Sequence, residues 1–196
     1  MKRSCLTAGV VLLVLAGPVR GQGLHLTPLV GAFHPESGVH DLDDISGEGR
    51  LLKGNALAVG LNAEFSIFRA SFAYATGATI TGDGIANGDD IGDGSLLAVT
   101  GGVVLRPLPR VAVLQPYITG GIGLKREAYS LESTGFSNLL PEAETEFGWH
   151  FAIGADLMLG GLGLAAEVSD VITGGEDELF GRHDMFIMAG LRLRLF

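Results

Sequence analysis

The sequence has little cysteine and few basic residues, and these two shortages exclude several kinds of function. Its 196 residues include one cysteine, Cys5, and 13 Lys and Arg against 22 Asp and Glu, which gives a formal net charge of -9. A single thiol cannot close an intramolecular disulfide or build a thiolate metal site. So few basic residues are poorly suited to neutralising the phosphates of a nucleic acid. We therefore expect no nucleic-acid partner and no cysteine chemistry.

Long apolar runs are also missing, apart from a short one near the start. A basic beginning is followed by an apolar stretch at 6–16 and by small or helix-breaking residues at 17–21. The stretch is shorter than the roughly 20 residues that cross a bilayer as a helix. This arrangement is typical of a signal peptide. We predict a signal peptide at 1–21, removed together with Cys5, and one exported domain at 22–196.

Glycine is abundant, with 31 residues, and apolar residues alternate with small or polar ones in steps of two. In 56–65, for example, Leu57, Val59 and Leu61 are separated by small or polar residues. A period of two indicates β-strands with one apolar face. The pattern predicts eight strands of about ten residues, at 24–33, 56–65, 68–74, 97–106, 118–125, 147–157, 162–169 and 187–195.

The connections between these strands alternate between long and short. The long ones, which hold 18 of the 22 acidic residues, are 34–55, 81–94, 127–146 and 174–184. In an antiparallel sheet the long loops then share one end, which is strongly acidic. An even number of strands with short turns at one end and long loops at the other is typical of outer-membrane β-barrels. We predict an all-β, eight-stranded antiparallel up-and-down transmembrane β-barrel in the cell outer membrane of a Gram-negative bacterium.

A closed barrel of this size has an interior filled by side chains, because a sheet in hydrocarbon can leave no backbone group unpaired. The alternation predicts that charged residues of both signs lie inside, where buried charges require partners. We predict a structural network of ion pairs in the lumen formed by Glu64, Arg69, Arg106, Lys125, Asp156, Glu167, Arg192 and Arg194.

Two further features of the strands carry predictions. Aromatic residues near strand ends are expected to form interfacial girdles. Those expected there are Phe33, Phe147, Trp149 and Phe186 toward the long loops, with Phe65 and Phe68 at the first short turn. Pro28 interrupts the first strand, and because proline cannot donate to a ladder we predict a bulge there.

The chain resembles the small eight-stranded outer-membrane proteins of the OmpA transmembrane domain, OmpX and OmpW type. The resemblance rests on the signal peptide, on the segment QPYITGGIGL at 115–124 and on the final alternating strand AGLRLRLF at 189–196. It covers essentially the whole mature chain. It implies that Phe196 is the signal read by the barrel-assembly machinery, and that outer-membrane lipids and lipopolysaccharide surround the barrel.

Enzymatic and metal sites find little support in the residues. A lipid deacylase of this architecture has a His-x-Ser pair, but here His150 is followed at that spacing by Ala152. We expect His150 in the lumen, bonded to a carboxylate. In the acidic segment 82–94, alignment of Asp89 with the first position of an EF-hand loop puts Thr100 where glutamate is required. We predict no catalytic residue, no metal site and no cofactor.

The prediction is therefore a non-enzymatic barrel with a structural role in the envelope, or a surface-interaction role through four acidic extracellular loops. Two alternatives stay open. One is a narrow channel or carrier for small or hydrophobic molecules, which the eight charged inward residues oppose. The other is a lipid-modifying outer-membrane enzyme whose acid–base pair is assembled from residues distant in sequence.

Overall fold

The structure, a computed structural model, describes residues 23–35, 40–42, 49–83, 90–108, 113–131, 143–174 and 181–195. The predicted signal peptide at 1–21 and the predicted assembly signal Phe196 lie outside these residues. Within the described ranges, no helix is long and apolar enough to cross a membrane.

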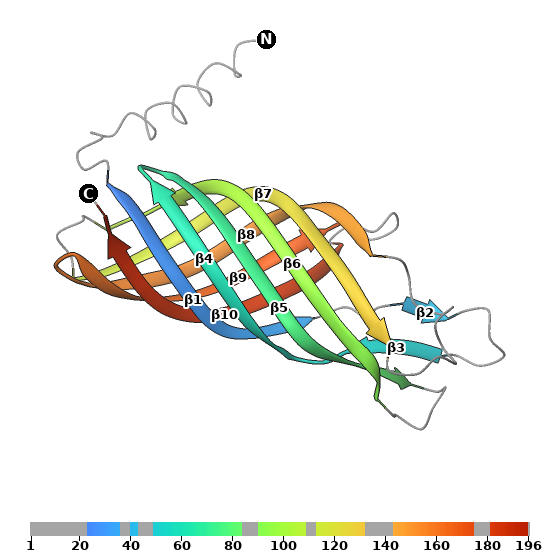
Figure 1. Cartoon of the computed structure of the whole chain (residues 1–196). Helices are drawn as coiled ribbons and strands as arrows, with labels where there is room; N and C mark the ends of the chain where they lie inside the picture. The colour runs from blue at the N-terminus through green and yellow to red at the C-terminus, as the bar shows by residue number, and fades with distance from the viewer. Residues whose placement is uncertain are drawn as a thin grey trace, which may run out of the picture.

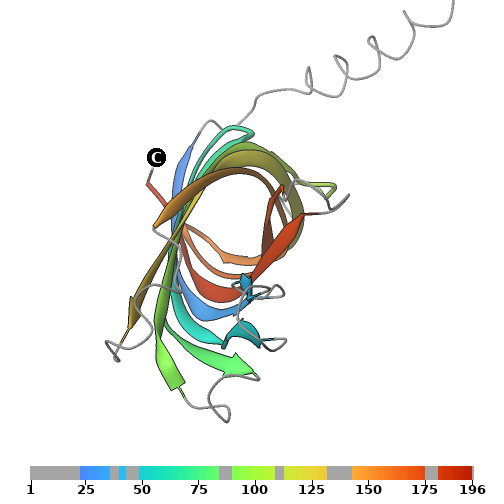
Figure 2. The ribbon, with the colours of Figure 1, turned by 90° about the vertical axis from the view of Figure 1, so that its right-hand side faces the viewer.

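The described residues form ten β-strands, and eight of these close into a barrel (Figure 1). The strands are β1 (Leu24–Pro35), β2 (His40–Leu42), β3 (Gly49–Lys53), β4 (Ala56–Phe65), β5 (Phe68–Asp83), β6 (Asp90–Leu105), β7 (Leu114–Leu131), β8 (Glu144–Leu159), β9 (Leu162–Thr173) and β10 (Arg182–Arg194). The ring runs β4-β1-β10-β9-β8-β7-β6-β5 and back to β4, with every pair antiparallel. Figure 2 shows this ring from one end. The predicted eight-stranded antiparallel barrel is confirmed.

The two ends of the barrel differ in their connections. Tight turns join β4 to β5 and β8 to β9 at what we call the turn end; the opposite end is the loop end. Gly160 takes φ +75° in the second of these turns, a conformation that glycine adopts without strain. The first and last described strands also meet at the turn end, where the Leu195 amide donates to the Leu24 carbonyl at 2.9 Å.

The exterior of the barrel is apolar, as the alternation predicts. Leu57 and Val59 are 62% and 45% exposed, whereas Ala58 between them is fully buried. Large apolar side chains are exposed in the same way on all eight strands of the ring. A wall of this kind, closed and fully paired in its backbone, is stable in hydrocarbon.

The strands are longer than predicted at the loop end. β5, β6 and β8 have 16 residues and β7 has 18, so strand pairing reaches into the predicted loops 81–94 and 127–146. Loop 34–55 contains the β2–β3 hairpin, which pairs with the end of β5. The apolar alternation marks only the part of a strand that faces hydrocarbon. Beyond the hydrocarbon, backbone pairing continues with polar side chains, and the sequence pattern is lost.

Two of the predicted girdle aromatics lie inside the barrel instead. Phe147 and Trp149 are exposed on the outer wall, whereas Phe33 and Phe186 are fully buried and their ring centroids lie 5.1 Å apart. Strand parity explains the difference, because the outward Ile187 directs its neighbour Phe186 inward. The girdle prediction was wrong for this pair.

The bulge predicted at Pro28 is also wrong. Leu26 pairs with Leu193 and Leu29 with Gly190, so the register between β1 and β10 is the same on both sides of the proline. This ladder omits Thr27 and Pro28, while the ladder from β1 to β4 continues through both residues. Pro28 has no amide proton to donate, and only the ladder between β1 and β10 is interrupted as a result. The register shifts occur between β5 and β6 near the loop end.

Glycines inside the barrel permit close strand approach, and one adjacent pair tests this. A Cβ on Gly121 would lie 2.3 Å from the Gly101 carbonyl oxygen, whereas a Cβ on Gly120 would meet nothing within 4 Å. We expect Gly121→Ala to lower the free energy of unfolding by about 1–3 kcal/mol through overpacking, and Gly120→Ala to leave it nearly unchanged. Urea titration of the protein folded into lipid vesicles measures both; equal effects would contradict the inward placement of Gly121.

Candidate functional site

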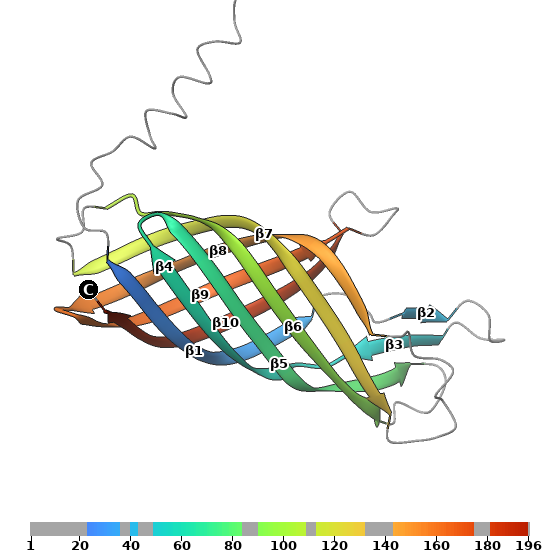
Figure 3. The same cartoon turned by 45° about the horizontal axis from the view of Figure 1, so that its top comes forward.

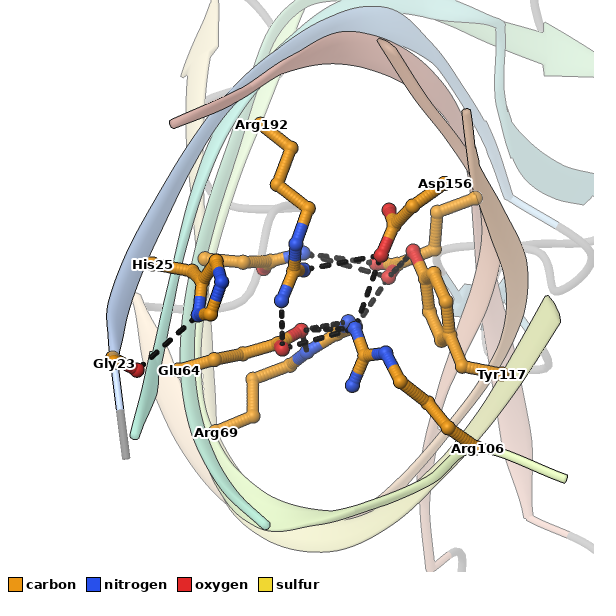
Figure 4. Close-up of polar contacts among 10 residues, drawn as sticks. Gly23, His25, Glu64, Arg69, Arg106, Tyr117, Asp156 and Arg192 are labelled. Atoms are coloured by element: carbon orange, nitrogen blue, oxygen red, sulfur yellow. Dashed lines mark hydrogen bonds and ion pairs between the residues drawn. The ribbon is translucent and has the colours of Figure 1, made fainter. Parts of the chain in front are cut away.

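Charged side chains from six segments meet inside the barrel near the turn end (Figure 4). We call this group the turn-end cluster. Its members are Glu64 of β4, Arg69 of β5, Arg106 after β6, Asp156 of β8, Glu167 of β9 and Arg192 of β10. Three guanidinium groups face three carboxylates, so the cluster is electrically balanced.

Glu64 is the centre of the turn-end cluster, since it contacts all three arginines. Arg69 Nε donates to Glu64 Oε1 at 2.9 Å, and Arg192 Nη2 donates to Glu64 Oε2 at 2.6 Å. Arg106 Nη2 lies 2.9 Å from the same Oε2. The Glu64 side chain is only 3% exposed. Buried charges of this kind are stable only with such partners.

The other two carboxylates extend the cluster across the lumen. Asp156 Oδ2 lies 3.0 Å from Arg106 Nη2 and 3.2 Å from Arg192 Nη1. Glu167 pairs with Arg69 and accepts a hydrogen bond from the Tyr117 hydroxyl at 2.8 Å. The Arg69 guanidinium also lies over the Tyr117 ring, with Cζ 4.5 Å from its centroid. These contacts tie strands on opposite sides of the barrel together.

A second charged group, the loop-end cluster, surrounds Lys125 nearer the other end. Lys125 Nζ lies 2.7 Å from Asp184 Oδ2, 3.0 Å from Glu127 Oε1 and 3.3 Å from Glu146 Oε2. Arg182 pairs with Glu146 as well. Lys125 is 1% exposed although it carries a charge. The side chains of two cationic and three acidic residues therefore extend across the lumen at this level.

An apolar layer contributes to the barrel interior in addition to the two clusters. Phe33 and Phe186 pack there with the buried side chains of Val171 and Met188 and with a series of alanines. His150 is also buried, and it lines a cavity of about 10 Å³ beside Glu167. No described carboxylate bonds to its ring, so that part of the His150 prediction was wrong.

Comparison with known proteins identifies solved structures that have the same fold. No family model and no curated protein matches the sequence. The outer membrane protein OprG from Pseudomonas aeruginosa superposes with a TM-score of 0.64 at 14% identity, covering 89% of this chain and 96% of that one. Neisserial surface protein A (NspA) superposes with a TM-score of 0.55 at 12% identity, covering 88% and 97%. The chain has the fold of the small outer-membrane β-barrels.

An outer-membrane location follows from this fold together with the apolar wall. A closed antiparallel barrel with an apolar exterior is the form in which strands cross that membrane. In barrels of this kind, short turns face the periplasm and long loops face the outside.

The structure separates the eight lumen residues predicted for this outer-membrane barrel into three places. Six form the turn-end cluster, and Lys125 belongs to the loop-end cluster. Arg194 is exposed and lines the turn-end mouth, so it is not a member of either cluster. The alternation places Arg194 on the same side of β10 as Arg192. Because the strand ends at Arg194, however, its side chain lies at the opening of the barrel and not in the interior.

Several partners in the clusters were not predicted from the sequence. Tyr117 alternates with the outward Ile118, and this alternation could have placed it inside. The carboxylates around Lys125 fall in the predicted loops 127–146 and 174–184, and no apolar alternation marks them. Within the described ranges, no group of three or more His, Cys, Asp or Glu side chains is placed to hold a metal ion.

Proposed function

We propose that this outer-membrane barrel does not conduct, and that it serves the envelope structurally while presenting an acidic surface to the outside. The observation that carries the proposal is the filling of the lumen. The turn-end cluster, the apolar layer around Phe33 and Phe186, and the loop-end cluster each place buried side chains inside the barrel. A conducting path would require several buried ion pairs to separate, and each separation costs free energy because it leaves a buried charge without its partner.

The same arrangement argues against a carrier for hydrophobic molecules through the barrel. A hydrophobic solute would have to pass two levels of paired charges, and separating these pairs leaves charges without partners in a low dielectric. The apolar layer is itself packed, since the cavity beside His150 measures about 10 Å³.

The loop end supports the surface role. β5, β6 and β7 extend past the neighbouring strands, and the β2–β3 hairpin continues their sheet (Figure 3). The last residues of β7, from Ala128 to Leu131, pair with β6, whereas the β7–β8 ladder ends at Glu127. The four predicted loops hold 18 of the 22 acidic residues, and 15 of these remain for the surface after Glu127, Glu146 and Asp184, which lie in the loop-end cluster, are left out. An acidic surface of this kind suits basic partners and the divalent cations that neutralise lipopolysaccharide phosphates.

A conductance measurement tests the closed lumen. Purified protein is folded into planar bilayers, and insertion is verified by the shift between boiled and unboiled samples on a denaturing gel. We expect no current steps above the bare bilayer, while a large porin inserted in the same way conducts. Regular steps from the inserted barrel would contradict the proposal.

A deletion strain tests the two roles separately. We expect loss of the protein to increase sensitivity to detergents and large antibiotics, and the wild-type gene to reverse the change. A variant with 36–53 replaced by a short linker, which removes five of the loop carboxylates, should restore resistance but weaken binding of the cells to basic surfaces. Unchanged sensitivity together with unchanged binding would contradict the proposed function.

A further inference from the structure

The turn-end mouth contains a cavity of about 130 Å³, enough for several waters. It lies against the turn-end cluster and opens on the side that faces the periplasm. Its charged lining consists of three guanidinium groups, from Arg106, Arg192 and Arg194, and one carboxylate, from Glu64. The cavity belongs neither to the loop end nor to the proposed surface role.

The carboxylate in this lining is already used, but several guanidinium donors are not. Glu64 accepts from or pairs with three arginines, so its oxygens are occupied by the cluster. Arg106 makes its contacts to Glu64 and Asp156 through Nη2 alone, which leaves the protons of its Nε and Nη1 unused among the described residues. The side chain of Arg194 enters no ion pair within the described part of the chain and is exposed at the mouth.

The net charge at the cavity is positive, and like the unused donors it favours an anionic ligand. Among the described residues, the six members of the turn-end cluster neutralise one another, and Arg194 adds one positive charge beside them. A cavity with unused N–H donors and excess positive charge is complementary to an oxyanion. Guanidinium forks match the oxygens of a phosphate group in particular.

From the cavity, its unused guanidinium donors and its uncompensated charge, we infer that the turn-end mouth is a binding site for a phosphate group, carried by free phosphate or by a lipid headgroup. Arg194 is the outer contact and Arg106 the inner one. The Arg126 side chain, which is exposed on the outer wall near the loop end, provides a matched cation far from the mouth.

Arginine Nε–H resonances test the site in the full barrel, held in a phosphate-free maltoside detergent. One arm adds inorganic phosphate at constant ionic strength, with chloride as the reference. The second arm adds a short-chain phosphatidic acid, with the matching diacylglycerol as the reference. We expect the Arg106 and Arg194 signals to shift with saturation and the Arg126 signal to stay in place.

The two arms also identify the source of the phosphate. Saturable shifts with inorganic phosphate support a free solute, and shifts with the lipid alone support a headgroup. We expect Arg194→Gln to weaken binding by about tenfold or more, since it removes charge-assisted hydrogen bonds. Arg126→Gln should change nothing. The heat-dependent gel shift first verifies that the wild type and the variant are both folded. Equal shifts at Arg126 would then overturn the inference. The absence of a saturable shift in both arms would overturn it as well.

Discussion

Replacement of Phe72 by arginine is expected to lower the free energy of unfolding in lipid by about 2–4 kcal/mol. Phe72 lies on the outer wall of β5, is 42% exposed and pairs with the outward Leu61 and Val99. An arginine there must hold its charge among acyl chains or distort the bilayer to reach water. The only tryptophan, Trp149, is exposed on the same wall and reports unfolding from vesicles by fluorescence.

Thr76→Arg is the matched control for this substitution. Thr76 is outward and exposed on the same strand, four residues nearer the loop end. The cost of a charge on a barrel wall decreases toward the interface, so we expect a loss of about 0–1 kcal/mol. A third variant, Phe72→Leu, keeps the position apolar and should lose less than Phe72→Arg. Equal losses for the two arginine variants would show that the outer wall does not face hydrocarbon.

The second large effect is expected from Glu64→Gln, at about 3–5 kcal/mol of lost stability. The substitution removes the anion that Arg69, Arg106 and Arg192 share, and leaves buried guanidinium groups with too few carboxylates. Glutamine keeps the size of the side chain, so the loss reports charge and not volume. Urea unfolding in vesicles provides the measurement.

Asp93→Asn is the control for the charge change, since Asp93 is an exposed carboxylate near the loop end. We expect its effect to stay within about 0.5 kcal/mol. In a double-mutant cycle, Glu64→Gln combined with Arg192→Gln should cost less than the sum of the single losses, because the second change removes a charge that the first left without its partner. Additive losses would mean that the two side chains do not depend on one another.

The sequence was sufficient for the architecture because the rule behind it is local. In the hydrocarbon region, alternation separates Leu57 and Val59 on the wall from Ala58 in the interior, and eight such segments with alternating connections leave few topologies other than an antiparallel barrel. The same rule placed Glu64 and Arg69 inside. It failed at the loop end, where pairing of polar residues continues β7 to Leu131 without an apolar pattern.

The sequence by itself determined that eight strands form the barrel and which side of most strand residues faces the lumen, since both depend on residue type and a period of two. Only the tertiary structure decided which charges meet. Glu64 and Arg192 lie 128 positions apart, and their contact depends on strand tilt and register around the closed ring. The same geometry places Lys125 among carboxylates at another level and leaves Arg194 at the mouth. Pairing distances of this kind are set by closure of the barrel, which no local pattern encodes.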